Sequence, residues 1–317
     1  MSPGSKNSSP PEEHGRLPAR RSNLWLRARI IQSIRRFFIE QGYLEIETPQ
    51  LIPAPAPEVH IDAIKVEDRF LHTSPELCMK RLLSAGYPKI FQICRCFRHG
   101  ERGELHLPEF SLLEWYHTGI DYMGLMDECE KMILFVAHDQ GFGNTIEYLK
   151  REIDLRTPWD RISVKEAFRR FASIDMENAL ESGRFDEVMV KEIEPRVGIP
   201  KPTFLYDYPA TLAALARLKE NEPGLAERFE LYMGGLEMAN AFSELTDARE
   251  QKARFDRDLK QRQQLGKTVY PVPEKFLKSL PHMPPCAGIA LGVDRLVMLF
   301  ANKSRIDDVV SFTPEEL

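Results

Sequence analysis

Apolar residues recur every three or four positions in several segments of the chain. Residues 24–41 (LWLRARIIQSIRRFFIEQ) show this spacing and stop at Gly42, which predicts an amphipathic helix. Residues 74–86 open with Ser-Pro-Glu and end at Gly86, a pattern typical of a helix. Further helices are expected at 121–141, 163–174, 247–265 and 292–301.

Other segments alternate between apolar and polar positions, or form short apolar runs, as strands do. Strands are expected at 43–49, 91–97, 110–116, 202–209, 227–233 and 287–291, with a short strand pair within 61–71. No βαβ rhythm and no glycine-rich phosphate loop is visible. The predicted fold class is therefore α+β, with an antiparallel sheet flanked by helices. Residues 142–200 look like a mixed insertion with little readable chemistry.

The predicted hairpin at 91–116 concentrates charged residues between two strands. In its second strand, successive side chains alternate between the two faces of the sheet. One face carries Phe110, Leu112, Glu114 and Tyr116, and the other carries Ser111, Leu113 and Trp115. An aromatic ring, a carboxylate and a phenol on one face resemble the wall of a pocket. An ordinary two-sided amphipathic hairpin explains the pattern almost as well.

Composition and charge narrow the classes of function. The chain has 317 residues and a formal net charge of −5, so extensive binding along a nucleic acid is not indicated. No apolar run is long enough to cross a membrane. Five cysteines without a CxxC pair predict free thiols in a reducing cytoplasm, and for Cys94 and Cys96 a structural role is favoured over a metal site. Residues 1–21 resemble a disordered tail.

Several charged residues fit a site for ATP and an amine. Arg98 at a strand end and Arg295 at a helix start suit phosphate groups, although either arginine alone is more often an ion-pair residue. Glu237 and Glu244 invite a magnesium ion, but a spacing of seven puts them on opposite faces of a regular strand. They converge only if the strand breaks near residues 239–241. A cationic amine could be held by Glu76, Glu114, Tyr116 and Glu244.

With these motifs in order, the chain resembles the catalytic core of class II aminoacyl-tRNA synthetases, specifically the lysyl type. Residues 24–49 resemble motif 1, which forms the dimer interface in that family, and residues 97–116, with HLPEF and LLEWY, resemble motif 2. GIALGVDRLVMLF (residues 288–300) resembles motif 3, and TSPEL, PTFLYDYP and GLEMANAFSELTDAREQ resemble lysyl-type signatures between them. The resemblance covers roughly residues 22–313.

The resemblance implies a role for each matching residue. Arg98 would bind the substrate carboxylate and the α-phosphate, and Arg295 would bind the γ-phosphate. Magnesium would be held by Glu237 and Glu244. The other residues implied at the ATP site are His99, Gly100, His106, Phe110, Met238 and Gly292, with Phe110 stacked on adenine and His106 on phosphate. The residues implied around the amino acid are Ser74, Pro75, Glu76, Glu114, Tyr116, Asn240, Glu244 and Ala290.

Residues 22–317 are expected to form the catalytic domain, with no anticodon-binding domain before it. This arrangement resembles the stand-alone paralogues of the lysyl enzyme, the elongation factor P–(R)-β-lysine ligases. They activate lysine or (R)-β-lysine with ATP and Mg²⁺ and transfer it to a lysine of elongation factor P. Ala290 supports this resemblance, because tRNA-charging lysyl enzymes tend to have glycine there. The expected protein is a cytoplasmic homodimer for which tRNA is a poor candidate partner.

Motif 2 departs from the family pattern. His99-Gly100 follows Arg98 where Asn-Glu is usual, so the glutamate that commonly contacts adenine is absent, and Glu101 lies one position late. Leu107 replaces an asparagine, and Ala241 replaces a glycine. Two alternatives therefore stay open. One is an adenylate-forming ligase with another acceptor, tRNA or a small molecule, and the other is a binding protein without catalytic activity.

Overall fold

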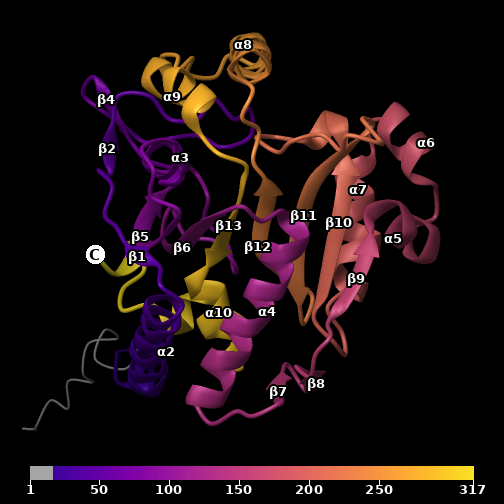
Figure 1. Ribbon diagram of the computed structural model, residues 1–317. Coiled ribbons are helices and arrows are strands. Elements are labelled where there is room, and N and C mark those ends of the chain that lie inside the picture. Colours follow the sequence, from indigo (N-terminus) through magenta and orange to yellow (C-terminus); the bar gives the residue numbers. More distant parts are fainter. Residues whose placement is uncertain (1–16) are drawn as a thin grey trace, which may run out of the picture.

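The computed structural model describes residues 17–317, which are built around one eight-stranded mixed sheet (Figure 1). In spatial order its strands are β1 (Leu44–Glu45), β5 (Lys89–Phe97), β6 (Glu109–Thr118), β13 (Cys286–Gly292), β12 (Leu236–Ser243), β11 (Leu225–Met233), β10 (Thr203–Pro209) and β9 (Asp160–Ser163). The six strands from β5 to β10 are antiparallel, and the edge strands β1 and β9 run parallel to their neighbours. The α+β class is confirmed, with two parallel edges that the sequence did not predict.

One face of the sheet is covered by three helices, α2 (Arg21–Glu40), α4 (Tyr122–Asp139) and α10 (Val293–Phe300) (Figure 1). Their apolar stripes pack with Leu113 and Trp115 of β6 in the main hydrophobic core. Asp121 begins α4 by accepting hydrogen bonds from two backbone N–H groups of its first turn. Because Leu113 and Trp115 face this core, alternation turns Leu112, Glu114 and Tyr116 to the opposite face.

The opposite face is covered at one end by α3 (Glu76–Ser84), α8 (Ala248–Gln264) and α9 (Glu274–Ser279), which share a second apolar cluster with Ile90 and Tyr116. A small sheet of β2 (Leu51–Ile52), β4 (Arg69–Leu71) and β3 (Lys65–Val66) accompanies them. The expected strand pair within 61–71 is confirmed as β3 and β4. These elements leave a cavity open above the centre of the sheet.

Residues 142–200 are more closely tied to the fold than an insertion would be. A hairpin of β7 (Thr145–Tyr148) and β8 (Arg151–Asp154) leads into β9, which joins the central sheet. The helices α5 (Val164–Phe171), α6 (Met176–Glu181) and α7 (Phe185–Val188), with a π-helical turn Met189–Ile193, enclose a separate apolar cluster around Phe168 and Phe185. Short 3₁₀ turns lie at Glu194–Arg196, Ala210–Leu212, Leu280–His282, Ile306–Val309 and Pro314–Glu316.

The expected disordered tail, residues 1–21, lies mostly outside the described residues. Where it is described the expectation is wrong, because residues 17–19 are helical and α2 begins at Arg21. Arg20 is buried there, and its guanidinium bonds the Glu316 carboxylate at 2.8 Å and the Ser311 carbonyl at 3.2 Å. None of the helices in the described part of the chain combines the length and apolar content needed to cross a lipid bilayer.

Candidate active site

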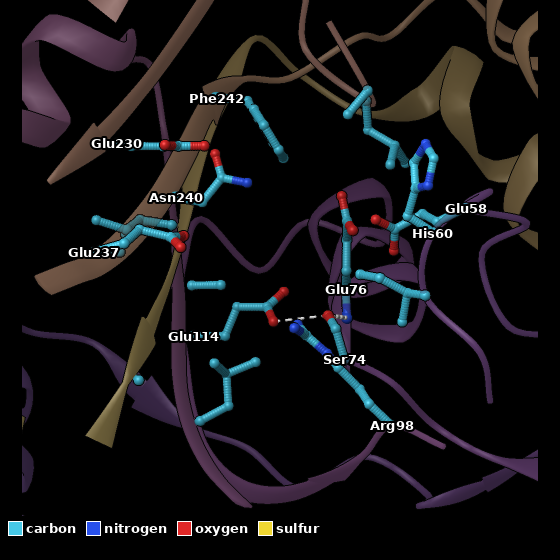
Figure 2. Close-up of a pocket in the computed structure, with 18 of the residues that line it drawn as sticks. Glu58, His60, Ser74, Glu76, Arg98, Glu114, Glu230, Glu237, Asn240 and Phe242 are labelled. Carbon is cyan, nitrogen blue, oxygen red and sulfur yellow. Dashed lines mark hydrogen bonds between the residues drawn. The ribbon is translucent and has the colours of Figure 1, made fainter. Parts of the chain in front are cut away.

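A cavity of about 570 Å³ lies on the face of the sheet that α2, α4 and α10 leave free (Figure 2). Its walls come mainly from β6, β12 and β13. Most residues proposed from the sequence line it, namely Ser74, Glu76, Arg98, His106, Phe110, Glu114, Tyr116, Glu237, Met238, Asn240, Glu244, Ala290, Gly292 and Arg295. The alternation proposed for the hairpin therefore describes a pocket wall.

Three of the proposed residues do not line the cavity. Pro75 precedes the first residue of α3 and contributes backbone to the helix start. His99 donates its backbone N–H to the Asp62 carbonyl at 2.7 Å, and Gly100 adopts a positive φ of 79° in an exposed turn. The loop turns away from the cavity immediately after Arg98. The atypical His99-Gly100 pair therefore lies outside the site, whereas Glu101 lines it and approaches Arg98 to 3.8 Å.

One end of the cavity is a buried cluster of acidic groups. Glu114 is 2% exposed and accepts hydrogen bonds from the Tyr116 hydroxyl at 2.5 Å and the Ser74 hydroxyl at 2.8 Å (Figure 2). Burial and the nearby Glu76 raise the pKa of Glu114 well above its usual range. Burial and Glu114 likewise raise the pKa of Tyr116. The buried Glu114 carboxylate therefore favours a cationic partner, whereas Tyr116 stays neutral and donates its hydroxyl proton.

Lys80 is the only positive charge in contact with this cluster among the described residues. Its ammonium, 1% exposed, lies 2.5 Å from Glu76 Oε1 and 2.5 Å from Glu244 Oε2. Burial lowers the pKa of Lys80, but Glu244 and Glu76 more than compensate and raise it. Burial raises the pKa of Glu244 to about 8, and its Oε1 has no hydrogen-bond donor among residues 17–317. Two carboxylates, Glu76 and Glu244, thus share one lysine, and Glu114 nearby is held only by hydroxyl groups, which leaves room for a second cation.

Gly288 and Ala290 of β13 keep this end of the cavity open. A Cβ at Gly288 would lie 2.2 Å from the Tyr116 ring and 2.6 Å from Glu244 Oε1. Any side chain at this position would therefore fill the space between these two groups. Ala290 pairs with Glu114 on one side and with Asn240 on the other, and its methyl group lines the cavity.

The opposite end of the cavity carries arginines. Arg295, in the first turn of α10, donates to the Glu237 carbonyl at 2.7 Å and lies 3.4 Å from its carboxylate. His106 Nε2 lies 2.7 Å from Arg295 Nη2. Burial and then the Arg295 charge lower the pKa of His106. The neutral ring accepts from the guanidinium and holds it in place.

Arg98 enters the cavity from the end of β5 (Figure 2). Its guanidinium lies over the Phe110 ring, 4.9 Å from the ring centroid, in a cation–π contact. Its buried Nε has no acceptor among the described residues. A guanidinium held by a ring and a single distant carboxylate keeps most of its donors available for an anion.

The helix that carries Arg295 is fixed by its neighbour Asp294. This carboxylate is 2% exposed and accepts the Ser111 backbone N–H at 2.7 Å, and it also contacts Arg27 of α2. Arg27 in turn donates to the Ser111 hydroxyl at 2.7 Å. Asp294 therefore joins α2, β6 and the start of α10, which fixes the direction of Arg295. In GVDR, Asp294 therefore anchors the start of the helix, and Arg295 extends into the cavity.

The structure does not bring Glu237 and Glu244 to one metal ion. A bulge at Met238 shifts the register of β12 against β11, so both carboxylates reach the cavity face. The break in alternation thus exists, just before the expected residues 239–241. The two residues nevertheless stand at opposite ends of β12, roughly 20 Å apart along the strand. Magnesium bonds of about 2 Å cannot join them.

At the arginine end, the carboxylate that lies near Glu237 belongs to Glu230 and not to Glu244. It lies on β11 opposite Asn240 and faces the same part of the cavity as Glu237 (Figure 2). Its carboxylate accepts from Arg228 at 2.5 Å and from two tyrosine hydroxyls, Tyr208 at 2.7 Å and Tyr232 at 2.8 Å. Burial and then Glu230 raise the pKa of Glu237. These two carboxylates therefore present oxygen atoms at the arginine end of the cavity (Figure 2).

The sequence missed Lys80, Arg228, Glu230 and Glu58. Lys80 lies four residues after Glu76, a spacing also typical of surface ion pairs. Glu230 is separated from Glu237 by the turn at Gly234 and Gly235, so a seven-residue spacing across this hairpin brings both carboxylates to the same part of the cavity (Figure 2). Glu58 comes from the proline-rich loop, and burial followed by Glu76 raises its pKa to about 7. No local signal marked it.

Residues 14–316 match the family described as tRNA synthetases class II (D, K and N). This chain belongs to the class II tRNA synthetase family. Similar curated proteins are each named Elongation factor P--(R)-beta-lysine ligase. One from Proteus mirabilis is 39% identical over 92% of this chain and 94% of its own length. Others from Hamiltonella defensa and Salmonella arizonae are 40% and 39% identical, over 93% and 92% of this chain and 95% and 94% of their own lengths.

Membership in the class II synthetase family agrees with the position of the three motifs. Motif 1 corresponds to α2 and β1, motif 2 to the β5–β6 hairpin, and motif 3 to β13 and α10. All three belong to the same sheet or pack against it. The expected class II synthetase fold is therefore confirmed. The similar curated proteins are named as ligases.

Proposed function

We propose that this protein activates lysine, or (R)-β-lysine, with ATP and transfers the acyl group to a lysine side chain of elongation factor P. The observation that carries the proposal is the division of one cavity into an acidic end and an arginine end. The acidic end holds Glu114 and the two carboxylates that share Lys80. The names of the similar curated proteins support the acceptor and the amino acid.

The acidic end is suited to the side-chain ammonium of the amino acid. Glu244 has a free oxygen, and Glu114 is oriented by Tyr116 and Ser74. A second ammonium in this cluster would offset the excess of negative charge that burial makes costly. Ala290 pairs with Glu114, and its methyl group narrows the space available to the α- or β-amine of the substrate, as distinct from its side-chain ammonium. This contact supports a preference for the β-amino acid.

The arginine end is suited to ATP. Arg98 has unpaired donors close to the centre of the cavity, where the substrate carboxylate meets the α-phosphate, and Arg295 lies beyond it for the γ-phosphate. His106 fixes Arg295, and Phe110 offers a ring for the adenine base on the side that Arg98 does not cover. The contribution of the protein is positioning and charge neutralisation, without a covalent enzyme intermediate.

Glu230 and Glu237 are the residues proposed to hold Mg²⁺ at the arginine end. Carboxylate oxygens are the ligands that this ion prefers, and the mutual repulsion of the two carboxylates favours a cation between them. Mg²⁺ bound there would neutralise phosphate charge. Arg228 and the two tyrosines that bond Glu230 would orient its carboxylate.

The reaction proceeds in two steps. A carboxylate oxygen of the amino acid attacks the α-phosphorus, an O–P bond forms, and the bond to the β-phosphate breaks with pyrophosphate leaving. The ε-amine of the acceptor lysine then attacks the acyl carbon, a C–N bond forms, and AMP leaves with the electron pair of the broken C–O bond. The amine gives up one proton to a base or to water. The product is an amide.

We also propose a cytoplasmic homodimer. Trp25 and Ile39 on α2 are 62% and 60% exposed, and Leu44 on β1 is 49% exposed. Trp25 and Ile39 are 14 residues apart, close to four helical turns, so they lie on one side of α2. A second copy of the chain would cover them, as the resemblance to motif 1 implies. All five cysteines are free thiols, which fits a reducing compartment.

The experiment that tests the proposal offers two acceptors to the enzyme. Purified protein, ATP, Mg²⁺ and one lysine isomer are incubated with elongation factor P and, separately, with tRNA. We expect the intact mass of the factor to rise by one lysyl group and tRNA to remain uncharged. An Arg98→Ala variant is the matched control and should leave the factor unmodified. Charged tRNA beside an unmodified factor would replace this proposal with a tRNA-charging enzyme.

A further inference from the structure

Three side chains of the types that bind metal ions meet at β5, the neighbour of the cavity-lining strand β6. Cys94 and Cys96 lie on the same face of β5, with their sulfur atoms 3.8 Å apart. His72, which follows β4, completes the group, and one ligand atom of each residue lies within 4.8 Å of the others. His72 is 1% exposed and Cys96 is fully buried. Among the described residues this is the sole cluster of its kind.

The spacing of the two sulfur atoms matches that of two ligands on one tetrahedral ion. Two Zn–S bonds of about 2.3 Å at a tetrahedral angle place the sulfur atoms about 3.8 Å apart. The observed separation is also 3.8 Å. The sulfur positions therefore need no rearrangement to bind zinc through both thiolates.

The imidazole is already oriented for a metal ion. His72 Nε2 lies 2.6 Å from the Arg95 carbonyl, which can only accept a hydrogen bond. Nε2 therefore carries the proton, and Nδ1 keeps its lone pair. A ring held by a backbone carbonyl through its second nitrogen is the usual arrangement of a metal-binding histidine.

A buried polar atom without a partner stands next to the cluster. Gln92 precedes Cys94 by two residues on the same face of β5 and is 3% exposed. Its Oε1 has no hydrogen-bond donor among residues 17–317. Gln92 thus offers an oxygen ligand for a fourth position that a water molecule could equally take.

We propose that His72 Nδ1, Cys94 Sγ and Cys96 Sγ form a binding site for a thiophilic divalent cation, with Zn²⁺ as the best match. Two thiolates and one imidazole are the ligands that select zinc over magnesium. Two thiolate charges also neutralise a divalent ion, which a buried site requires. This differs from the expectation at the level of sequence, where a structural role for the two cysteines was favoured. The site is separate from the magnesium pair and does not depend on the proposed function.

The test uses tag-free full-length protein and two metal probes. Zn²⁺ is titrated under reducing conditions and counted by elemental analysis after dialysis. Co²⁺ is added to a second sample because thiolate ligation gives a charge-transfer band in the near ultraviolet. We expect one Zn²⁺ per chain and a Co²⁺ band that Zn²⁺ abolishes.

The variants assign the ligands. Cys94→Ser and His72→Gln should lose both the band and the bound zinc, and glutamine keeps the N–H that bonds the Arg95 carbonyl. Cys78→Ser, another partly buried thiol, is the matched control and should keep both. Circular dichroism shows whether each variant folds. Wild-type protein that binds no zinc, or a site that survives in folded Cys94→Ser, would overturn the proposal.

Discussion

Gly288→Ala tests the geometry of the acidic end most sharply. The new Cβ would lie 2.2 and 2.4 Å from two Tyr116 ring carbons and 2.6 Å from Glu244 Oε1, whereas ordinary contacts lie at 3.4–4 Å. The ring must therefore move by about 1 Å, because a Cβ cannot share its space. That movement breaks the 2.5 Å hydrogen bond from Tyr116 to Glu114. Overpacking of this kind costs about 1–3 kcal/mol of unfolding free energy.

These free energies convert to measurable shifts. An unfolding entropy of about 2.1 cal/mol/K per residue, over 317 residues, gives about 0.7 kcal/mol/K, so the Tm should fall by about 2–5 °C. Loss of this hydrogen bond leaves a buried carboxyl group without its donor, which costs about 1–3 kcal/mol, so the KM for the amino acid should rise roughly 5- to 150-fold. The KM for ATP should change little, because the arginine end lies apart.

The assay is amino-acid-dependent exchange between ATP and pyrophosphate, with thermal unfolding in parallel. Gly224→Ala is the matched control, since a Cβ there meets no atom within 4 Å and its φ is not positive. It should leave Tm and both KM values unchanged. A Gly288→Ala enzyme with the wild-type KM for lysine would refute the assignment of the amine site to this end of the cavity.

Three further predictions concern charge. Lys80→Met removes the ammonium between Glu76 and Glu244 and should cost about 3–5 kcal/mol of stability at pH 9; the cost should be smaller at pH 6, because Glu244, whose pKa is raised to about 8, is protonated there. Thermal unfolding at both pH values checks this. Because the pKa of Glu244 is about 8, binding of a substrate ammonium should release a proton below that pH, so affinity should rise from pH 6 to pH 8; calorimetry in two buffers with different ionisation heats would show no proton release if this is wrong. Glu230→Gln should raise the Mg²⁺ concentration needed for exchange, whereas Glu244→Gln should raise the KM for lysine instead; the reverse result would restore the metal pair first expected from the sequence.

Local patterns predicted the parts of the site that local geometry controls. Period-two alternation in the second strand of the hairpin placed Glu114 and Tyr116 on the cavity face, because β6 is regular and one of its faces is fully covered by helices. The position of Arg295 in the first turn of a helix was also predictable, because the apolar pattern of α10 is regular. In these cases the sequence spacing and the spatial arrangement carry the same information.

Contacts set by register and by loops could not be predicted. The approach of Glu230 and Glu237 to the same part of the cavity (Figure 2) depends on how β11 and β12 align across a bulge, and a spacing rule along a single strand cannot describe it. The role of Lys80 could not be predicted because its partner Glu244 lies 164 positions later in the chain. His99 was wrongly predicted to lie in the ATP site. Its backbone N–H instead donates a hydrogen bond to the Asp62 carbonyl, which belongs to a loop distant in sequence.

In the proposed reaction, one cavity joins a cationic amino acid to ATP for transfer to elongation factor P. This is tested by the intact mass of elongation factor P after incubation with the enzyme, ATP, Mg²⁺ and (R)-β-lysine, with α-lysine in a parallel sample. We expect a gain of one lysyl group that requires Arg98 and is larger with (R)-β-lysine. An unchanged mass with both isomers, from an enzyme that still exchanges pyrophosphate, would contradict it.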